Sequence, residues 1–199
     1  TGMTLLIALT GTALGFALGL LVAIIRTIAL PEKKKAGSNA GVIVKRGLLR
    51  FVHMLMNVYI QVFRGTPMIV QAVVIYYGAQ YAGVFMDTTF AAVFIISINT
   101  GAYMAEIIRG GIVSVDKGQF EAAHAIGMTH WQTMTTVVLP QAIRNILPSV
   151  GNELIVNIKD SSVLNVISVS ELFFQAKSAA GTYYRYFEVY FIIAVIYLI

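Results

Sequence analysis

The sequence predicts an all-α integral membrane protein, and three observations support this class. Of its 199 residues, 58% are hydrophobic and 12% are charged, with a mean hydropathy of +0.79, which is unlike an ordinary soluble domain. Apolar stretches long enough to cross a bilayer, about 20 residues, recur along the chain. The basic residues gather beside these stretches. Cysteine is absent, which excludes disulfides, thiolate metal sites and cysteine nucleophiles.

The net charge of +5 is concentrated in one segment. Between residues 31 and 50, six basic side chains stand against the single acid Glu32 and account for the whole net charge: Lys33, Lys34, Lys35, Lys45, Arg46 and Arg50. A basic run beside apolar spans indicates a cytoplasmic loop. Its position argues against a nucleic-acid-binding role.

We predict five membrane-spanning helices within a single transmembrane domain over residues 1–199. They lie at about residues 4–30, 55–81, 88–108, 149–170 and 185–199 and beyond. Residue 1 would lie outside the membrane, and Asp87 would lie in a short outer connection without basic residues. No cleavable signal peptide is evident. Because the chain begins almost at one span and ends inside another, we expect it to be a portion of a longer protein.

Glycine and proline mark two features of the first two spans. Gly11, Gly15 and Gly19 recur at four-residue spacing and predict a face where another helix approaches closely. Gly65 and Pro67 interrupt the second span, which is tolerated where backbone is buried in protein or lines a cavity. A simple kink is the alternative interpretation of that second pattern.

A connecting loop at residues 115–140 separates the third and fourth spans and is itself mixed in polarity. Asp116 with Gln119, and Thr129 with Gln132, have capping-box spacing and therefore predict the starts of two short helices.

A glycine and a proline are expected to mark the ends of the two helices of this loop. Gly127 stands where the first helix would end, because glycine adopts the left-handed conformation at little cost. Pro140 is expected to stop or tilt the second helix. Two short helices at an angle beside the membrane suit the transfer of movement from a soluble partner.

Polar side chains recur on one face of the third span. Asn99, Tyr103 and Glu106 are spaced i, i+4, i+7, and polar groups in a membrane segment usually face the interior of the bundle. They could also serve only to hold helices together. For Glu106 and Arg109 a local ion pair is the favoured interpretation.

The fourth span carries a similar stripe. Glu153, Asn157 and Asp160 again follow i, i+4, i+7, which predicts a polar face directed into the bundle. Lys159 could neutralise one of the carboxylates, in which case the stripe would be structural.

The loop resembles the cytoplasmic signature of ABC importer permeases, which is Glu-Ala-Ala, three residues, Gly, nine residues, Ile-x-Leu-Pro. Six residues match at this spacing, and Val137 replaces the isoleucine: Glu121, Ala122, Ala123, Gly127, Leu139 and Pro140. The stretches at residues 64–67, Arg-Gly-Thr-Pro, and at residues 103–111 resemble the permeases of amino-acid importers.

The resemblance implies a five-helix ABC importer permease bundle with cytoplasmic coupling helices, in the bacterial inner membrane. It implies the histidine/glutamine/glutamate/arginine group of importers. The expected partners are a cytoplasmic ABC ATPase dimer, a second permease subunit and an extracytoplasmic amino-acid-binding protein or fused domain. The chain has no Walker A loop, so it is expected to be non-hydrolytic, with ATP and magnesium held by the ATPase. We expect no catalytic residue, cofactor or metal in this chain.

Two groups of functional residues follow. The six residues of the loop signature are the expected ATPase-coupling residues. Five polar residues within the spans are the candidates for the substrate path: Thr66, Asn99, Glu153, Asn157 and Asp160. A polar amino acid would offer its ammonium group to the acids and its carboxylate to Asn99, Asn157 and the backbone near Thr66. The two acids favour a cationic or amide substrate over glutamate.

Other functions remain open from the sequence. An importer of a different small solute would carry the same loop signature. A secondary transporter could use the membrane carboxylates for ion coupling, but it would leave the loop without a role. A membrane enzyme is disfavoured because the histidines and carboxylates have no recognisable catalytic spacing. The sequence decides neither the amino acid nor whether the two permease subunits are identical.

The predicted topology can be tested by cysteine labelling, since the chain has no native cysteine. Ser38→Cys and Ser114→Cys should react with an impermeant thiol reagent only from the cytoplasmic side, and Asp87→Cys only from the outside. Labelling of Asp87→Cys from the cytoplasm would contradict the five-span arrangement.

Overall fold

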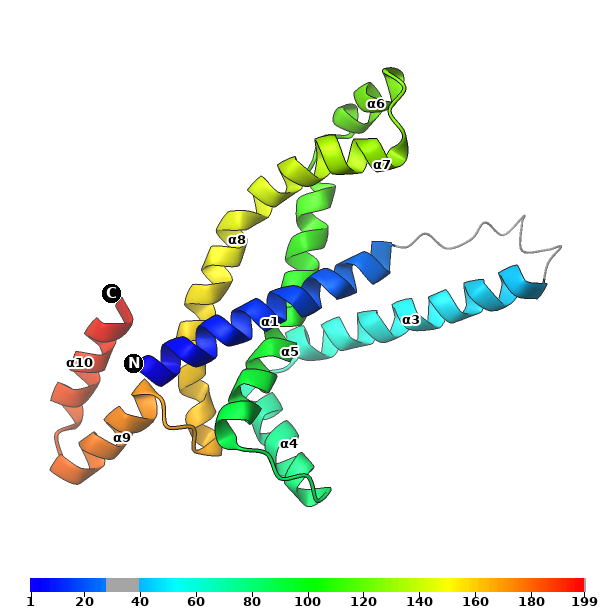
Figure 1. Cartoon of the computed structure of the whole chain (residues 1–199). Coiled ribbons are helices and arrows are strands. Elements are labelled where there is room, and N and C mark those ends of the chain that lie inside the picture. Colours follow the sequence, from blue (N-terminus) through cyan, green and yellow to red (C-terminus); the bar gives the residue numbers. More distant parts are fainter. Residues whose placement is uncertain (28–39, 199) are drawn as a thin grey trace.

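The computed structural model describes residues 1–27 and 40–198, and all regular structure within these ranges is helical (Figure 1), which confirms the predicted class. The basic cluster at residues 33–35 and Ser38 lie outside the described residues. The elements in chain order are α1 (Gly2–Thr27), α3 (Ala40–Gly65), α4 (Met68–Tyr81), α5 (Thr88–Val113), α6 (Lys117–Ala125), α7 (His130–Gln132), a π-helical segment (Thr133–Val138), α8 (Leu139–Asp160), a 3-10 segment (Ser161–Ile167), α9 (Leu172–Tyr183) and α10 (Tyr186–Leu198).

Two helices, α1 and α5, are each long and apolar enough to cross a membrane. The pair α3 and α4 passes the same criterion as one span, although the two helices are bent by 114° at their junction. The fourth and fifth predicted spans correspond to α8 with its 3-10 segment and to the shorter apolar helix α10. The helix of the second predicted span begins at Ala40, and the helix of the fourth begins at Leu139, both earlier than the sequence suggested.

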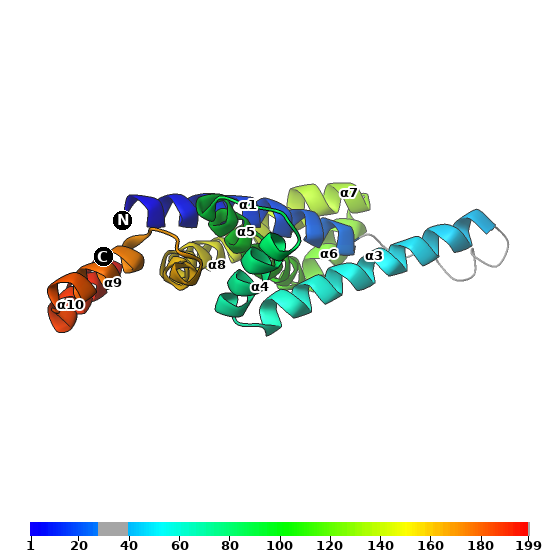
Figure 2. The same cartoon turned by 90° about the horizontal axis from the view of Figure 1, so that it is seen from below.

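The centre of the bundle is the contact between α1 and α5, which is the most extensive helix pairing among the described elements. Figure 2 shows α1 along one side of α5 and α4 along the other. The three glycines of α1 face α5, and a Cβ atom built on Gly15 would lie 2.6 Å from the Thr100 Cβ. The predicted close-packing face is therefore confirmed. A core of buried aliphatic residues adjoins this contact and includes Ile7, Ile95 and Leu164.

A complete break separates α3 from α4, so the simple-kink alternative is wrong. Thr66 and Pro67 are non-helical, and the freed carbonyls find an unexpected partner in Gln71. Its Nε2 donates to the Phe63 and Thr66 carbonyls, each at 2.9 Å. Since an unpaired carbonyl at membrane depth is costly, these two bonds make the break tolerable.

Helix α5 begins with a side-chain cap at Asp87. The backbone N–H groups of Thr89 and Phe90 donate to Asp87 Oδ2 at 2.8 and 3.1 Å. The bonds from Phe90 and then Thr89 hold the pKa of the Asp87 carboxyl below its ordinary value.

The loop between α5 and α8 contains the two predicted short helices, with one capping box rather than two. Thr129 and Gln132 form the reciprocal box, with the Thr129 N–H donating to Gln132 Oε1 at 2.8 Å. Asp116 accepts from the Gly118 N–H, but Gln119 is turned toward Gln141 and does not close a second box. Gly127 has φ +82°, which confirms its left-handed conformation.

Pro140 does not stop the second helix. The chain stays helical from His130 to Asp160, with a π-helical segment immediately before α8, and Pro140 lies in the first turn of α8. Pro140 has no N–H to donate to the preceding turn. The π segment, in which the Leu139 N–H donates five residues back to the Met134 carbonyl, shifts the hydrogen-bond register by one residue and so accommodates the proline. Figure 1 shows the helical run changing direction here, so the tilt was the correct alternative.

The glycine contact between α1 and α5 yields a stability prediction. Gly15→Val should lower the free energy of unfolding by about 1–3 kcal/mol, because the added methyl groups overlap Thr100. Gly78→Val is the matched control, since a Cβ at this helical glycine meets nothing within 4 Å. The melting temperature in detergent should fall for Gly15→Val alone. Equal melting temperatures would contradict the packing argument.

Candidate functional site

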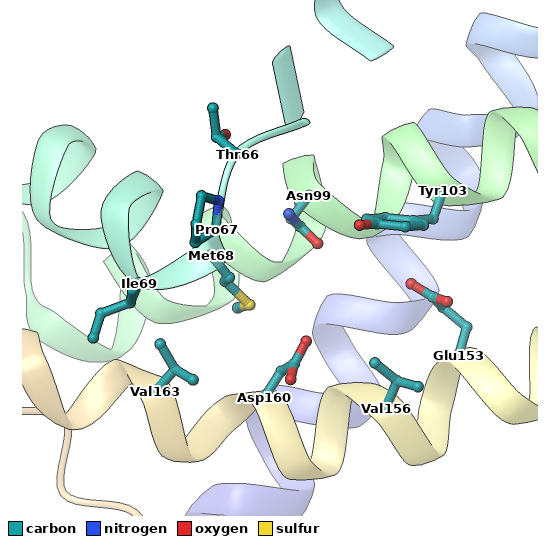
Figure 3. A pocket seen from close by; sticks show the side chains of 10 residues that line it. All are labelled: Thr66, Pro67, Met68, Ile69, Asn99, Tyr103, Glu153, Val156, Asp160 and Val163. Carbon is teal, nitrogen blue, oxygen red and sulfur yellow. The ribbon is translucent and has the colours of Figure 1, made fainter. Parts of the chain in front are cut away.

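A cavity of about 430 Å³ lies where the α3–α4 break faces α5 and α8 (Figure 3), within the usual size range of ligand sites. Polar residues of two helices, α5 and α8, line it together with Thr66 of the break: Thr66, Asn99, Tyr103, Glu153 and Asp160. Apolar side chains, among them Met68 and Val156, fill the space between them. Four of the five candidates for the path therefore meet in one place.

Asn99 lies at the boundary between this cavity and the break. Its Nδ2 donates to Gln71 Oε1 at 2.9 Å and to the Phe63 carbonyl at 3.3 Å. These bonds occupy the amide nitrogen, and the amide oxygen points toward the cavity in Figure 3. Asn99 is thus an acceptor in the cavity rather than the expected donor.

The two acids of α8 project into the same space in Figure 3. Among the described residues, neither Glu153 nor Asp160 has a basic nitrogen within 4.0 Å. Lys159 lies on the other side of α8, near Thr4 and Tyr197, so it does not neutralise them. Two unpaired carboxylates in a partly buried cavity favour a cationic group as ligand. Within the described part of the chain, no group of three histidines or acids is placed to hold a metal ion.

Asn157 is absent from the cavity lining, contrary to the sequence analysis. It is 2% exposed, donates to Thr12 Oγ1 at 2.8 Å and accepts from Thr100 Oγ1 at 3.1 Å. It therefore ties α8 to α1 and α5. The three residues of the α8 stripe lie within about 60° around the helix axis. One side of this stripe faces the cavity, and the other side packs against α1 and α5.

Two residues of this region were missed as site residues. Gln71 fixes the break, and its signal was the one amide in the otherwise apolar residues 68–75. Tyr103 was placed on the Asn99 face but not assigned to the path. Its ring lines the cavity and carries the Arg64 guanidinium at 5.4 Å from the centroid.

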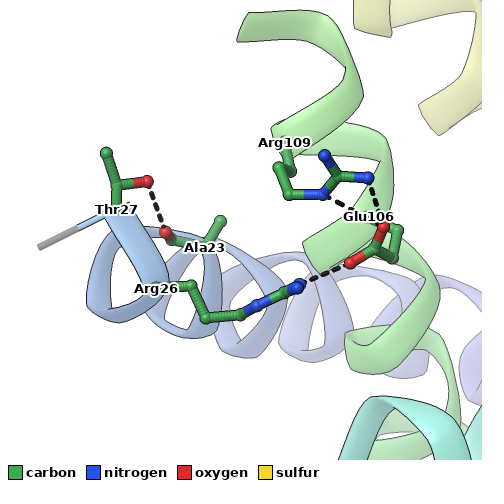
Figure 4. Close-up of polar contacts among 5 residues, drawn as sticks. All are labelled: Ala23, Arg26, Thr27, Glu106 and Arg109. Atoms are coloured by element: carbon green, nitrogen blue, oxygen red, sulfur yellow. Dashed lines mark hydrogen bonds and ion pairs between the residues drawn. The ribbon is translucent and has the colours of Figure 1, made fainter. Parts of the chain in front are cut away.

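One helical turn beyond Tyr103, Glu106 accepts from two arginines (Figure 4). The Arg109 Nε and Nη2 donate at 3.1 and 2.8 Å, which confirms the predicted local pair. The second partner is Arg26 at the end of α1. The sequence does not predict this second partner, because Arg26 and Glu106 are 80 residues apart and no spacing rule connects them.

The two short helices expose most of the loop-signature residues. Glu121, Ala122, Gly127 and Pro140 are exposed, Leu139 is 37% exposed, and Ala123 is buried. A small core beneath α6, formed by Val115, Val138 and Ala142 with Phe120 and Met134, attaches these helices to α8. The outer side presents Ile126 and Trp131, which are 79% and 75% exposed. Large exposed apolar residues on neighbouring short helices are typical of protein interaction sites.

The relatives found by comparison with known proteins agree with one another. Residues 37–199 match the family described as binding-protein-dependent transport system inner membrane component. The glutamine transport system permease protein GlnP of Escherichia coli strain K12 is 39% identical over 199 residues, which cover 99% of this chain and 82% of that protein. The arginine transport system permease protein ArtQ of Bacillus subtilis is 42% identical over 142 residues, covering 71% and 65%.

Solved structures agree. The chain of a crystal structure of an amino acid ABC transporter with histidines superposes with a TM-score of 0.85 at 39% identity, covering 98% of this chain and 83% of that one. An inward-facing MetNI methionine ABC transporter superposes with a TM-score of 0.68 at 20% identity, covering 98% and 85%, and supports the fold alone.

Proposed function

This chain belongs to the family of binding-protein-dependent transport system inner membrane components, and we propose that it carries polar amino acids through the cavity described above. It is the transmembrane subunit of an ATP-driven importer. The observation that carries the proposal is the polar cavity at the α3–α4 break, where two acids without a basic partner among the described residues face the uncapped start of α4.

The cavity offers a complement to each end of an amino acid. Glu153 and Asp160 accept from the ammonium group or from a cationic side chain. The N-terminus of α4, at Met68 and Ile69, lies opposite and offers backbone N–H groups to the carboxylate. Because two acids outnumber the single carboxylate of the ligand, we favour cationic or amide-bearing substrates over glutamate.

The partners follow from the family. We propose that a cytoplasmic ATPase dimer, which holds ATP and magnesium, binds the exposed face of α6 and α7. A second permease subunit would complete the path, and an extracytoplasmic binding protein or domain would deliver the substrate. The loop between α5 and α8 would then lie in the cytoplasm of a bacterial cell.

One helical run supports a mechanical role for the short helices. From His130 the chain continues without a non-helical break through α8 to Asp160, so α7 and both cavity acids belong to one run. The small core under α6 joins that helix to the same run. ATP-driven movement of the partner would therefore shift the acids relative to the α3–α4 break, and so switch the access to the cavity.

A secondary transporter is the second candidate, because unpaired acids at membrane depth also suit ion coupling. It would leave the exposed Ile126 and Trp131 without a partner. Co-purification of an ATPase with the chain separates the two functions.

The coupling hypothesis predicts the effect of two substitutions. Gly127→Val forces a branched side chain into φ +82°, at a cost of about 1–3 kcal/mol, and Glu121→Lys reverses a charge on the exposed face of α6. Both proteins should insert normally but show weaker ATPase binding and slower uptake. Gly181→Val on α9, another glycine with open space around it, is the control. Unchanged uptake in both variants would remove the coupling role from this loop.

The cavity hypothesis predicts a change in affinity. Glu153→Gln and Asp160→Asn each remove a charged acceptor, and a charged hydrogen bond contributes about 1.5–3 kcal/mol. The substrate concentration for half-maximal uptake should rise about tenfold or more, most for a cationic amino acid. Uptake into proteoliposomes with a panel of amino acids measures this, with Glu188→Gln on α10 as the control. If both variants keep the original affinity and preference, the acids are structural.

A further inference from the structure

A second hollow, of about 290 Å³, lies between α5 and α8 on the side of the short helices. Its lining includes Glu106, Gly110 and Ser114 from α5, and Asn145 and Ser149 from α8. Ion pairing accounts for Glu106, but neither the fold nor the proposed function explains why a hollow with these polar groups lies here.

The hollow continues the faces that line the cavity. On α5, the residues Asn99 and Tyr103 line the cavity, and the next positions on the same face, Glu106 and Gly110, line the hollow. On α8, Glu153 lines the cavity and Ser149, one turn away, lines the hollow. The two spaces are therefore consecutive along one pair of helices, about one turn or 5.4 Å apart.

Helix α3 carries a polar stripe on the same side of the bundle. Arg50, Asn57, Gln61 and Arg64 are all exposed and follow one another at steps of seven, four and three residues. Arg64 stacks on Tyr103, which places this stripe beside the cavity. Asn57, Gln61 and Arg64 lie within the predicted second span, where polar side chains do not face lipid without great cost, so this side borders water or protein. Arg50 precedes that span.

The net charge of the ionisable side chains changes sign from the cavity to the hollow. The cavity holds two acids without a basic partner among the described residues, whereas Glu106 in the hollow is held by Arg26 and Arg109. The Glu106 cluster is thus net cationic, and of its three side chains Glu106 lines the hollow while the two arginines lie outside the lining. At the far end of the hollow, Asn145 Nδ2 donates to Ser114 Oγ at 2.9 Å and bridges the two helices.

We propose that this hollow is the exit section of the substrate path, through which a zwitterionic amino acid moves from the cavity toward the short helices. Its ammonium group leaves the acids of α8 as its carboxylate meets the cationic Glu106 cluster. The Asn145–Ser114 bond closes the section and opens when α8 moves against α5. This inference rests on the proposed function, and extends it to residues outside the cavity.

Gly110 offers a direct test of the exit section. A Cβ built on it meets nothing within 4 Å, whereas one on the neighbouring Gly111 collides with Ile146. Gly110→Leu therefore fills the hollow without disturbing the packing. Gly151→Leu is the matched control, because that glycine also has open space and lies on the opposite side of α8. In proteoliposomes, Gly110→Leu should lose most of the uptake, as narrowing a path does, and Gly151→Leu should keep it. Equal uptake by both variants would overturn the proposal.

A second measurement separates this proposal from the proposed function. Ser149→Cys and Gly151→Cys can be compared in the assembled importer, since the chain has no other cysteine. A hydrophilic thiol reagent should modify Ser149→Cys faster, and the modification should block uptake. If Ser149→Cys is no more reactive than Gly151→Cys, the exit section is wrong, whatever is transported. If it is reactive but the unmodified protein takes up no amino acid, the exit section stands as a water-accessible path and the proposed substrate fails.

Discussion

The hydrogen bonds of Gln71 are the interaction on which the central cavity depends. At membrane depth, a broken helix survives only where its freed backbone groups are satisfied within the protein. At the α3–α4 break, Gln71 satisfies these groups by donating to the Phe63 and Thr66 carbonyls. Its own side-chain oxygen accepts from Asn99. The break is thus fixed to α5, and the bend of 114° leaves a space that a straight span would fill.

A second constraint is the close packing of α1 against α5, to which α8 is attached. The glycine face of α1 lets α5 approach closely, and Asn157 joins both helices to α8 through Thr12 and Thr100. Such buried polar contacts between membrane helices typically contribute about 0.6 kcal/mol each to stability. Their main effect here is therefore to fix the relative positions of the helices. Arg26 adds a tie at the other end of α1 through Glu106. Against this framework α8 is the element that connects the short helices with the cavity.

Two groups of opposite net charge lie along α5 and α8. The acids Glu153 and Asp160 line the cavity, and a cationic cluster around Glu106 lies one turn beyond Tyr103. The cavity acids and Glu106 differ in their ion-pair partners. The acids of α8 lack a basic partner among the described residues, whereas Glu106 has two. The acids of the cavity are therefore open to a solvent or ligand molecule, whereas Glu106 belongs to a structural cluster of ion pairs.

The sequence by itself determined the helical class, the glycine face, an interruption near Gly65 and Pro67, the left-handed Gly127 and the two short helices of the loop, because each depends on local backbone chemistry and on helical periodicity. It did not decide between a kink and a complete break, which depends on the partner that Gln71 provides for the freed carbonyls. Periodicity also placed Glu153, Asn157 and Asp160 on one stripe, but it does not say which neighbour covers each edge of that stripe. Only the tertiary structure decided that Asn157 packs against α1 and α5 while the two acids face the cavity. The same holds for Gln71 with Asn99 and for Arg26 with Glu106, which are 28 and 80 residues apart in the chain. Such pairings are set by how the helices cross, which no local spacing rule records.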